Sequence, residues 1–196
     1  MKGGANSSIS IIQIGSPKIE EDSDFYILIV DCGGETTIPS YIRDQRKSLI
    51  KKGYLIIYGL LDVRPNWARD QIPQLEKFLY FRLPQKEIET VFILSVMEIE
   101  AWFLAEDKHY HKIHPNLNID TIRKINFFDP LSNTELIDEP AILLNNIYQN
   151  VGLSYHKNKK KISRTVNNLD YENLYFHVVK RNRSFETLIN SIHKFI

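Results

Sequence analysis

Three short apolar runs occupy the first half of the chain. Residues 25–31, 54–61 and 90–96 are rich in Ile, Val and Leu and have the length of buried β-strands. Apolar positions recur at helical spacing between these runs, in residues 36–52 and 73–84. Because a strand, a helix and a second strand at these lengths form a βαβ unit, we expect the strands to be parallel neighbours.

The pattern changes in the second half of the chain. Residues 108–133 show no clear periodicity and are interpreted as a loop-like connection. Residues 134–150 predict one or two helices, with Pro140 as an interruption. Residues 184–195 carry apolar side chains at helical spacing and predict a terminal helix.

These elements predict the fold class and its organisation. We expect an α/β core over residues 25–107, in which helices flank a mostly parallel sheet. Residues 1–24 are expected to form an N-terminal extension or an edge strand. Residues 108–196 are expected to form a helical, basic C-terminal part that packs on the same domain.

Composition places the chain among ordinary globular proteins. It has 196 residues, of which 43% are hydrophobic and 25% are charged. Cys32 is the single cysteine, which excludes an internal disulfide and fits a reducing compartment. No apolar run approaches the ~20 residues of a membrane span, and the first residues lack the apolar segment of a signal peptide. We therefore expect a cytoplasmic protein without membrane contact.

The formal net charge of +1 hides a strong asymmetry along the chain. Residues 151–196 contain nine Lys and Arg against three Asp and Glu, which gives about +6, whereas residues 1–150 carry about −5. A basic segment on an acidic body is typical of proteins that bind a phosphate-bearing partner. The alternative is a helical face that is merely solvated.

Acidic residues follow each of the three predicted strands. Glu35 comes after the first strand, Asp62 ends the second, and Glu98 and Glu100 follow the third. Because the carboxyl ends of parallel strands meet at one edge of a sheet, we expect these side chains to converge there. Converging carboxylates recruit a cation, and oxygen ligands of this kind suit Mg²⁺ or Mn²⁺. The alternative is that each acid only ends a strand or caps a helix.

The same positions carry a resemblance to a known family. Cys-Gly-Gly-Glu35, Leu-Leu-Asp62 and the stretch Glu-Ile-Glu-Ala-Trp-Phe-Leu-Ala-Glu that ends at Glu106 resemble the Toprim superfamily. They look most like its small, uncharacterised bacterial members. The resemblance covers residues 25–107 and implies the fold of topoisomerase, primase and nuclease domains.

The resemblance also implies roles for single residues. Glu35 takes the place of the family's catalytic general acid or base, and Asp62 takes the place of its first metal-binding aspartate. The second aspartate is replaced by Arg64, so this chain departs from the family pattern. Glu98 or Glu100 is our candidate for the missing ligand.

The sequence leaves three functions open. The first is a Mg²⁺-dependent phosphodiester-cleaving enzyme, resembling a nuclease, that acts on nucleic acid. The second is a non-catalytic Toprim-like subunit that binds nucleic acid or another protein, and the resemblance implies an ATPase as that partner. The third is a domain that binds a small phosphorylated ligand at the same edge of the sheet.

Basic side chains provide candidate phosphate contacts. Lys and Arg neutralise phosphates without reading base sequence, and Tyr155 is positioned in the sequence to stack on a base. Arg64 has a second interpretation, as an ion-pair partner of Asp62. The predicted phosphate or nucleic-acid contacts are Arg64, Lys157, Lys159, Lys160, Lys161 and Arg164.

Three histidines follow the family-like stretch. His109, His111 and His114 have a spacing that suggests zinc, but no cysteine lies nearby, and we expect exposed histidines in a loop. The chain contains no P-loop, no dinucleotide-binding glycine fingerprint and no nucleophile elbow. These absences argue against an NTPase, a dehydrogenase or an α/β-hydrolase.

Overall fold

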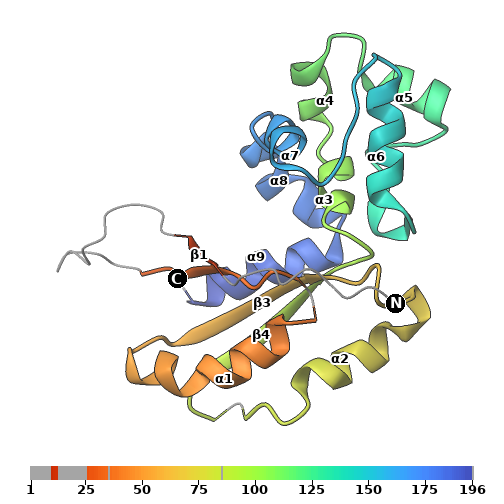
Figure 1. The fold of residues 1–196 in the computed structure, drawn as a ribbon. Helices are drawn as coiled ribbons and strands as arrows, with labels where there is room; N and C mark the ends of the chain where they lie inside the picture. Colours follow the sequence, from red (N-terminus) through yellow and green to blue (C-terminus); the bar gives the residue numbers. More distant parts are fainter. Residues whose placement is uncertain (1–9, 13–25, 35, 85, 196) are drawn as a thin grey trace.

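The computed structural model describes residues 10–12, 26–34, 36–84 and 86–195 (Figure 1). Its strands form two separate pairs. One pair is antiparallel and joins β1 (Ser10–Ile12) to β2 (Ile29–Asp31). The other is parallel and joins β3 (Ile56–Asp62) to β4 (Glu89–Ser95).

The parallel pair forms the centre of the α/β part. Its register places Ile56 beside Glu89 at one end and Asp62 beside Ser95 at the other. Helices α1 (Ile38–Lys51) and α2 (Ile72–Tyr80) lie on one side of this pair in Figure 1, and α9 (Arg183–Phe195) lies on the other. The buried core between these layers includes Ile42, Leu61, Leu75, Leu79, Phe92 and Leu94.

Local sequence explains where α1 begins and ends. Pro39 lies in the first turn, where a missing N–H costs nothing. Thr37 closes the preceding turn, because its hydroxyl donates to the Gly34 carbonyl at 2.7 Å. Gly53 follows the helix with a φ of 83°, a left-handed conformation that favours glycine. The predicted helix and its glycine stop are both confirmed.

The second half of the chain forms a helical layer. Buried Leu104, Tyr110, Leu144, Ile147 and Tyr148 form part of its core. Short 3-10 turns at Thr134–Leu136 and Val178–Lys180 connect elements of this layer, and another, at Arg69–Gln71, precedes α2 in the α/β part. The helices of this layer are α3 (Glu100–Ala105), α4 (Lys108–Ile113), α5 (Ile119–Asn126), α6 (Pro140–Gln149), α7 (Lys159–Val166) and α8 (Tyr171–Phe176).

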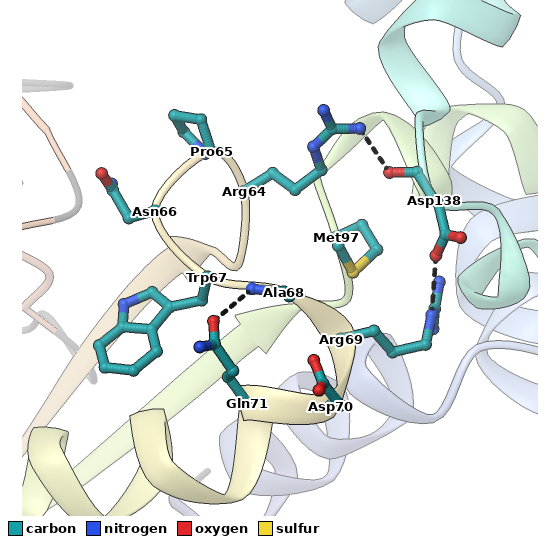
Figure 2. A pocket seen from close by; sticks show the side chains of 10 residues that line it. All are labelled: Arg64, Pro65, Asn66, Trp67, Ala68, Arg69, Asp70, Gln71, Met97 and Asp138. Atoms are coloured by element: carbon teal, nitrogen blue, oxygen red, sulfur yellow. Dashed lines mark hydrogen bonds and ion pairs between the residues drawn. The ribbon is translucent and has the colours of Figure 1, made fainter.

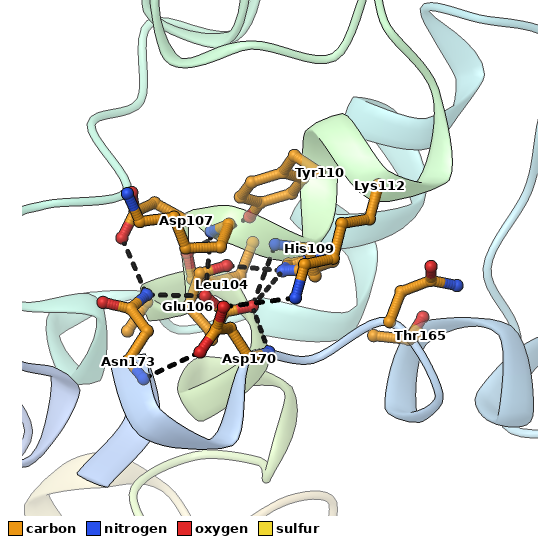
Figure 3. Close-up of polar contacts among 12 residues, drawn as sticks. Leu104, Glu106, Asp107, His109, Tyr110, Lys112, Thr165, Asp170 and Asn173 are labelled. Carbon is orange, nitrogen blue, oxygen red and sulfur yellow. Dashed lines mark hydrogen bonds and ion pairs between the residues drawn. The ribbon is translucent and has the colours of Figure 1, made fainter. Parts of the chain in front are cut away.

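Glu106 joins three of these helices through a buried network (Figure 3). Its carboxylate accepts the backbone N–H of Lys108 at 2.8 Å and of His109 at 2.9 Å, at the start of α4. It also accepts the Asn173 side-chain amide at 2.6 Å and the Asp170 N–H at 3.2 Å, at the start of α8. A single carboxylate at the end of α3 therefore satisfies the first turn of α4 and also holds the start of α8.

The prediction for the first strand is wrong in both its burial and its pairing partner. Residues 25–31 were expected to be buried on both faces and parallel to the next strand. Instead Ile27 is 78% exposed, and among the described residues β2 pairs only with β1, in antiparallel register. The apolar run does contain a strand, and its one pairing partner among the described residues is β1. The prediction failed because periodicity alone does not reveal which neighbours a strand acquires.

Two predictions for the second half also need correction. Residues 108–133 are not loop-like, because they contain α4 and α5. These helices are only six and eight residues long, so tertiary contacts rather than periodicity stabilise them. Pro140 begins α6 instead of interrupting a helix. The terminal helix is confirmed as α9.

The fold is thus mixed α/β, with a small two-stranded parallel sheet flanked by helices. Among the described residues, none of the helices has both the length and the apolar character to traverse a bilayer.

Candidate functional site at the ends of two parallel strands

Asp62 is the last residue of β3 and lies beside Ser95, the last residue of β4. The Ser95 hydroxyl donates to Asp62 Oδ1 at 2.5 Å, and the Ile99 backbone N–H donates to the same oxygen at 2.8 Å. One carboxylate oxygen is therefore held by the neighbouring strand end and by the turn that follows it. Oδ2 is left for other contacts.

Glu98 and Glu100 come from the turn between β4 and α3. Met97 gives this turn a positive φ of 55°, and its carbonyl accepts the Arg64 N–H at 2.8 Å, which ties the two strand ends together. Glu98 Oε2 accepts the Ala141 N–H at 3.1 Å, in the first turn of α6. Glu100 is the first residue of α3, with its side chain 1% exposed.

Lys157 connects all three carboxylates. Its Nζ lies 3.1 Å from Asp62 Oδ2, 3.3 Å from Glu98 Oε1 and 3.4 Å from Glu100 Oε2. The side chains of Asp62, Glu98 and Glu100, which we call the acid cluster, thus converge on one cationic group. Asp62, Glu98 and Glu100 lie 95, 59 and 57 positions before Lys157 in the chain, so the convergence is a long-range feature.

Tyr155 holds the innermost acid. Its hydroxyl donates to Glu100 Oε1 at 2.6 Å, and the ring is buried. Glu100 Oε2 is buried and has no hydrogen-bond partner among the described residues, so only the ion pair with Lys157 compensates it. A buried carboxylate oxygen without a hydrogen bond is costly, and the ammonium of Lys157 is the cation that faces it here.

The environment shifts the proton affinity of these groups. Burial raises the pKa of Glu100, although the Tyr155 hydrogen bond and the Lys157 charge oppose this shift. Partial burial alone would lower the pKa of Lys157, but Glu100 and Asp62 outweigh it and hold the pKa above its ordinary value. Burial and the hydrogen bond to Glu100 both raise the pKa of Tyr155. Lys157 is therefore a charged ammonium and Tyr155 a neutral donor at neutral pH.

The donor chemistry of the acid cluster suits Mg²⁺ or Mn²⁺, because both prefer carboxylate oxygens. When all three acids are ionised, one ammonium leaves two negative charges uncompensated. As the side chains lie, no three His, Cys, Asp or Glu residues of the described chain are arranged to hold a metal ion. In the acid cluster, the ammonium of Lys157 takes the position between the carboxylates.

Arg64 does not contact the acid cluster through any described ion pair. Its guanidinium pairs with Glu139 at 3.1 Å and donates to the Asp138 carbonyl at 2.9 Å. Arg69 bonds to the Asp138 carboxylate at 2.9 Å, and both arginines border an open depression of about 820 Å³ (Figure 2). The predicted ion pair of Arg64 exists, but its partner is Glu139 and not Asp62.

The other predicted phosphate contacts separate into two groups. Lys159 and Lys160 lie exposed in the first turn of α7, close in sequence to Lys157. Lys161 instead donates to the Ser154 hydroxyl at 2.7 Å, and Arg164 is half-buried. The suggestion that Tyr155 stacks on a base is wrong, because this ring is buried against Tyr148 and hydrogen-bonded to Glu100.

The histidines do not form a common site. His109 is fully buried and pairs with Glu106 at 3.4 Å, contrary to the prediction of exposed histidines. His111 is exposed and contacts the Pro115 carbonyl, whereas the His114 ring accepts the Asn116 N–H at 3.2 Å. Glu35, the predicted general acid or base, lies outside the described residues.

Sequence reasoning missed the contribution of Tyr155 and the contacts of Lys157, predicted as a phosphate ligand, with the acid cluster. Both lie far along the chain from the acids that they contact, 55 positions for Tyr155 and Glu100 and 95 for Lys157 and Asp62. A basic run next to an aromatic residue was the only local signal, and it indicated phosphate binding. It contained no information on which side chain turns inward.

No protein-family model, no curated protein and no solved structure matches the chain. The resemblance to the Toprim superfamily therefore stays a prediction, carried by the short motifs around Glu35, Asp62 and Glu98–Glu106.

Proposed function

We propose that the acid cluster is the catalytic centre of a Mg²⁺- or Mn²⁺-dependent phosphodiester-cleaving enzyme that acts on nucleic acid. The convergence of Asp62, Glu98 and Glu100 on one cation position carries the proposal. The buried oxygen of Glu100, which accepts no hydrogen bond within the described chain, supports it. Exposed Lys159 and Lys160 provide a phosphate-binding surface beside the site.

Each side chain has a role in this proposal. Asp62, Glu98 and Glu100 hold the metal, and Ser95 and Tyr155 orient Asp62 and Glu100 through hydrogen bonds. A bound metal ion polarises a phosphoryl group and lowers the pKa of a coordinated water. Lys157, whose side chain is 46% exposed, neutralises the cluster without metal and has a route to solvent when a divalent cation replaces it. Glu35 is the general acid or base that the resemblance implies.

Cleavage of labelled DNA and RNA, single- and double-stranded, in Mg²⁺, in Mn²⁺ and in EDTA tests the proposal. We expect cleavage that requires the metal and falls as the pH decreases, because Glu100 must lose its proton to bind a cation and its pKa is raised. Absence of cleavage of every substrate in both metals, with the protein folded, would contradict the proposal.

Lys157→Gln is expected to increase the affinity for Mn²⁺ about tenfold, which is ~1.4 kcal/mol, because a competing ammonium is removed from the cation position. Isothermal titration calorimetry with MnCl₂ measures this change. Lys159→Gln is the matched control, since it removes the same charge from an exposed side chain two positions away. Equal affinities of the two variants would show that the ammonium does not occupy the metal position.

Simultaneous Lys159→Ala and Lys160→Ala substitutions are expected to weaken binding of a single-stranded oligonucleotide in EDTA. The slope of log K against log salt concentration should become shallower by about 1.4, since each phosphate contact on a single strand contributes ~0.7. Fluorescence anisotropy at several salt concentrations measures both quantities. The control is a double variant, Lys47→Ala with Lys124→Ala, which changes two exposed lysines on α1 and α5. An equal loss of oligonucleotide affinity in both double variants would argue against a local phosphate surface.

A non-catalytic subunit is the second candidate, and two observations favour it. Lys157 already compensates the acid cluster, and Arg64, which replaces the family's second aspartate, is engaged by Glu139. A subunit of this kind would keep the fold while a partner, an ATPase by the resemblance, supplies the activity. It would bind nucleic acid or its partner without metal-dependent cleavage, and Lys157→Gln would then destabilise the fold without raising the Mn²⁺ affinity.

A further inference from the structure

A hollow of about 220 Å³ lies directly beside the acid cluster, between the loop after β3 and helices α1 and α2. Asp62 belongs to both, since it lines the hollow together with Leu61, the residue before it. The lining includes Leu61, Asp62, Asn66, Trp67, Leu75 and Phe78. We call it the Trp67 hollow.

The interior of the Trp67 hollow suits a flat apolar ring. Leu61 and Leu75 are buried and form an apolar surface. Trp67 and Phe78 add two aromatic rings whose centroids lie 6.2 Å apart, and Phe78 is 49% exposed. A cavity of about 150 Å³ accommodates benzene, so the Trp67 hollow has room for one heterocyclic ring system but not for a whole nucleotide.

One polar side chain at its edge, that of Asn66, has no partner within the described chain. Asn66 is exposed, and its amide forms no hydrogen bond to any described residue. Figure 2 shows that Asn66 points away from Arg64 and Asp138, so the network of the larger depression does not engage it. An amide supplies one acceptor and two donor hydrogens, the groups that recognise the edge of a nucleobase.

We propose that the Trp67 hollow binds one unpaired nucleobase of a single-stranded nucleic acid. This inference rests on the proposed function, because it places the adjacent phosphodiester at the acid cluster through the shared Asp62. The base stacks on Trp67, and Asn66 hydrogen-bonds its edge. The base must be unpaired, since in a duplex its faces are covered by neighbouring bases and its edge is paired. The inference predicts that the enzyme prefers single strands.

The two tryptophans of the chain make a direct measurement possible. Trp102 is buried, with its indole N–H donating to the Ser184 hydroxyl at 2.9 Å, whereas Trp67 is half-buried at the hollow. Quenching of tryptophan fluorescence by a nucleic acid therefore reports on Trp67. The probes are a thymidine octanucleotide and an abasic oligonucleotide of the same length, both in EDTA, so that phosphate binding is matched and cleavage is prevented.

We expect the thymidine octanucleotide to quench fluorescence and to bind about tenfold more tightly than the abasic strand, within the range for stacking of a base on an aromatic ring. Trp67→Ala should remove this difference while leaving abasic binding unchanged, and Trp67→Phe should restore most of it, as judged by anisotropy. Asn66→Ala changes an exposed side chain and keeps the hollow intact, so a smaller loss of the base-dependent affinity is expected without a folding defect. Phe127→Ala, an exposed aromatic that does not line the hollow, should have no effect.

Equal binding of the two strands to the wild-type protein would overturn the inference, as would a base-dependent difference that survives Trp67→Ala. Failure of the proposed function has another signature. If base-dependent quenching is present but no strand is cleaved in Mg²⁺ or Mn²⁺, the hollow binds a base and the acid cluster is not catalytic. If strands are cleaved without base-dependent quenching, the catalytic proposal stands and the base subsite does not.

Discussion

Asp62→Asn is expected to lower the rate of metal-dependent cleavage on the order of a thousandfold. Removal of one electrostatic group from a catalytic centre has an effect of this size. Asparagine keeps the shape of the side chain, and its remaining oxygen still accepts from Ser95 and the Ile99 N–H. The charge that faces Lys157 is lost, and an amide NH₂ replaces the oxygen that would bind the metal. Initial rates with a saturating labelled strand in Mn²⁺ measure the loss.

Two controls separate catalysis from folding in this experiment. Thermal unfolding should show that the variant retains the wild-type fold, because only one ion pair at a partly exposed lysine is weakened. Asp120→Asn removes an equal charge from a side chain that is 97% exposed, and it should leave the rate unchanged. Activity of Asp62→Asn close to that of the wild type would exclude this carboxylate as a metal ligand.

Glu106→Ala is expected to lower the free energy of unfolding by about 3–5 kcal/mol, the range for removing one partner of a buried charged network. Four N–H donors lose their acceptor at once, from Lys108, His109, Asp170 and Asn173 (Figure 3). Lys108 and His109 lie in the first turn of α4, so this helix loses the group that satisfies its free N–H groups, and the start of α8 loses its tie to the same carboxylate. Urea denaturation at neutral pH measures the change, and Glu172→Ala, an exposed acid in α8, is the control.

The same network predicts how the stability of the fold depends on pH in the acid range. Burial alone would raise the pKa of Glu106, but hydrogen bonds from His109 and Asn173 outweigh it and leave the pKa below its ordinary value. The stabilisation from ionised Glu106 is therefore complete above the unfolded-state pKa of ~4.3 and is lost as the pH falls through the lower folded-state pKa. The Glu106→Gln variant should be less stable than the wild-type protein at neutral pH, and it should lose less stability than the wild type on acidification. Parallel pH profiles of the two proteins would contradict this role.

The geometry of the acid cluster could be anticipated in part. The runs at 54–61 and 90–96 correspond to β3 and β4, and their parallel pairing brings the residues that follow them together. That reasoning placed Asp62 near Glu98 and Glu100, and the structure brings these three residues to one point. It failed for residues 25–31, because an apolar strand does not by itself reveal that its partner is antiparallel β1.

The sequence by itself determined several local elements: β3, β4, α1 with its glycine stop, and α9 all follow from side-chain spacing and turn residues within a few positions. Only the tertiary structure decided what compensates the acids and which polar groups are buried. Lys157 turns into the acid cluster, Tyr155 donates to Glu100, and His109 becomes fully buried. The reason is physical: spacing reports on neighbours along one element, whereas burial and ion pairing depend on elements that meet only after the chain has folded.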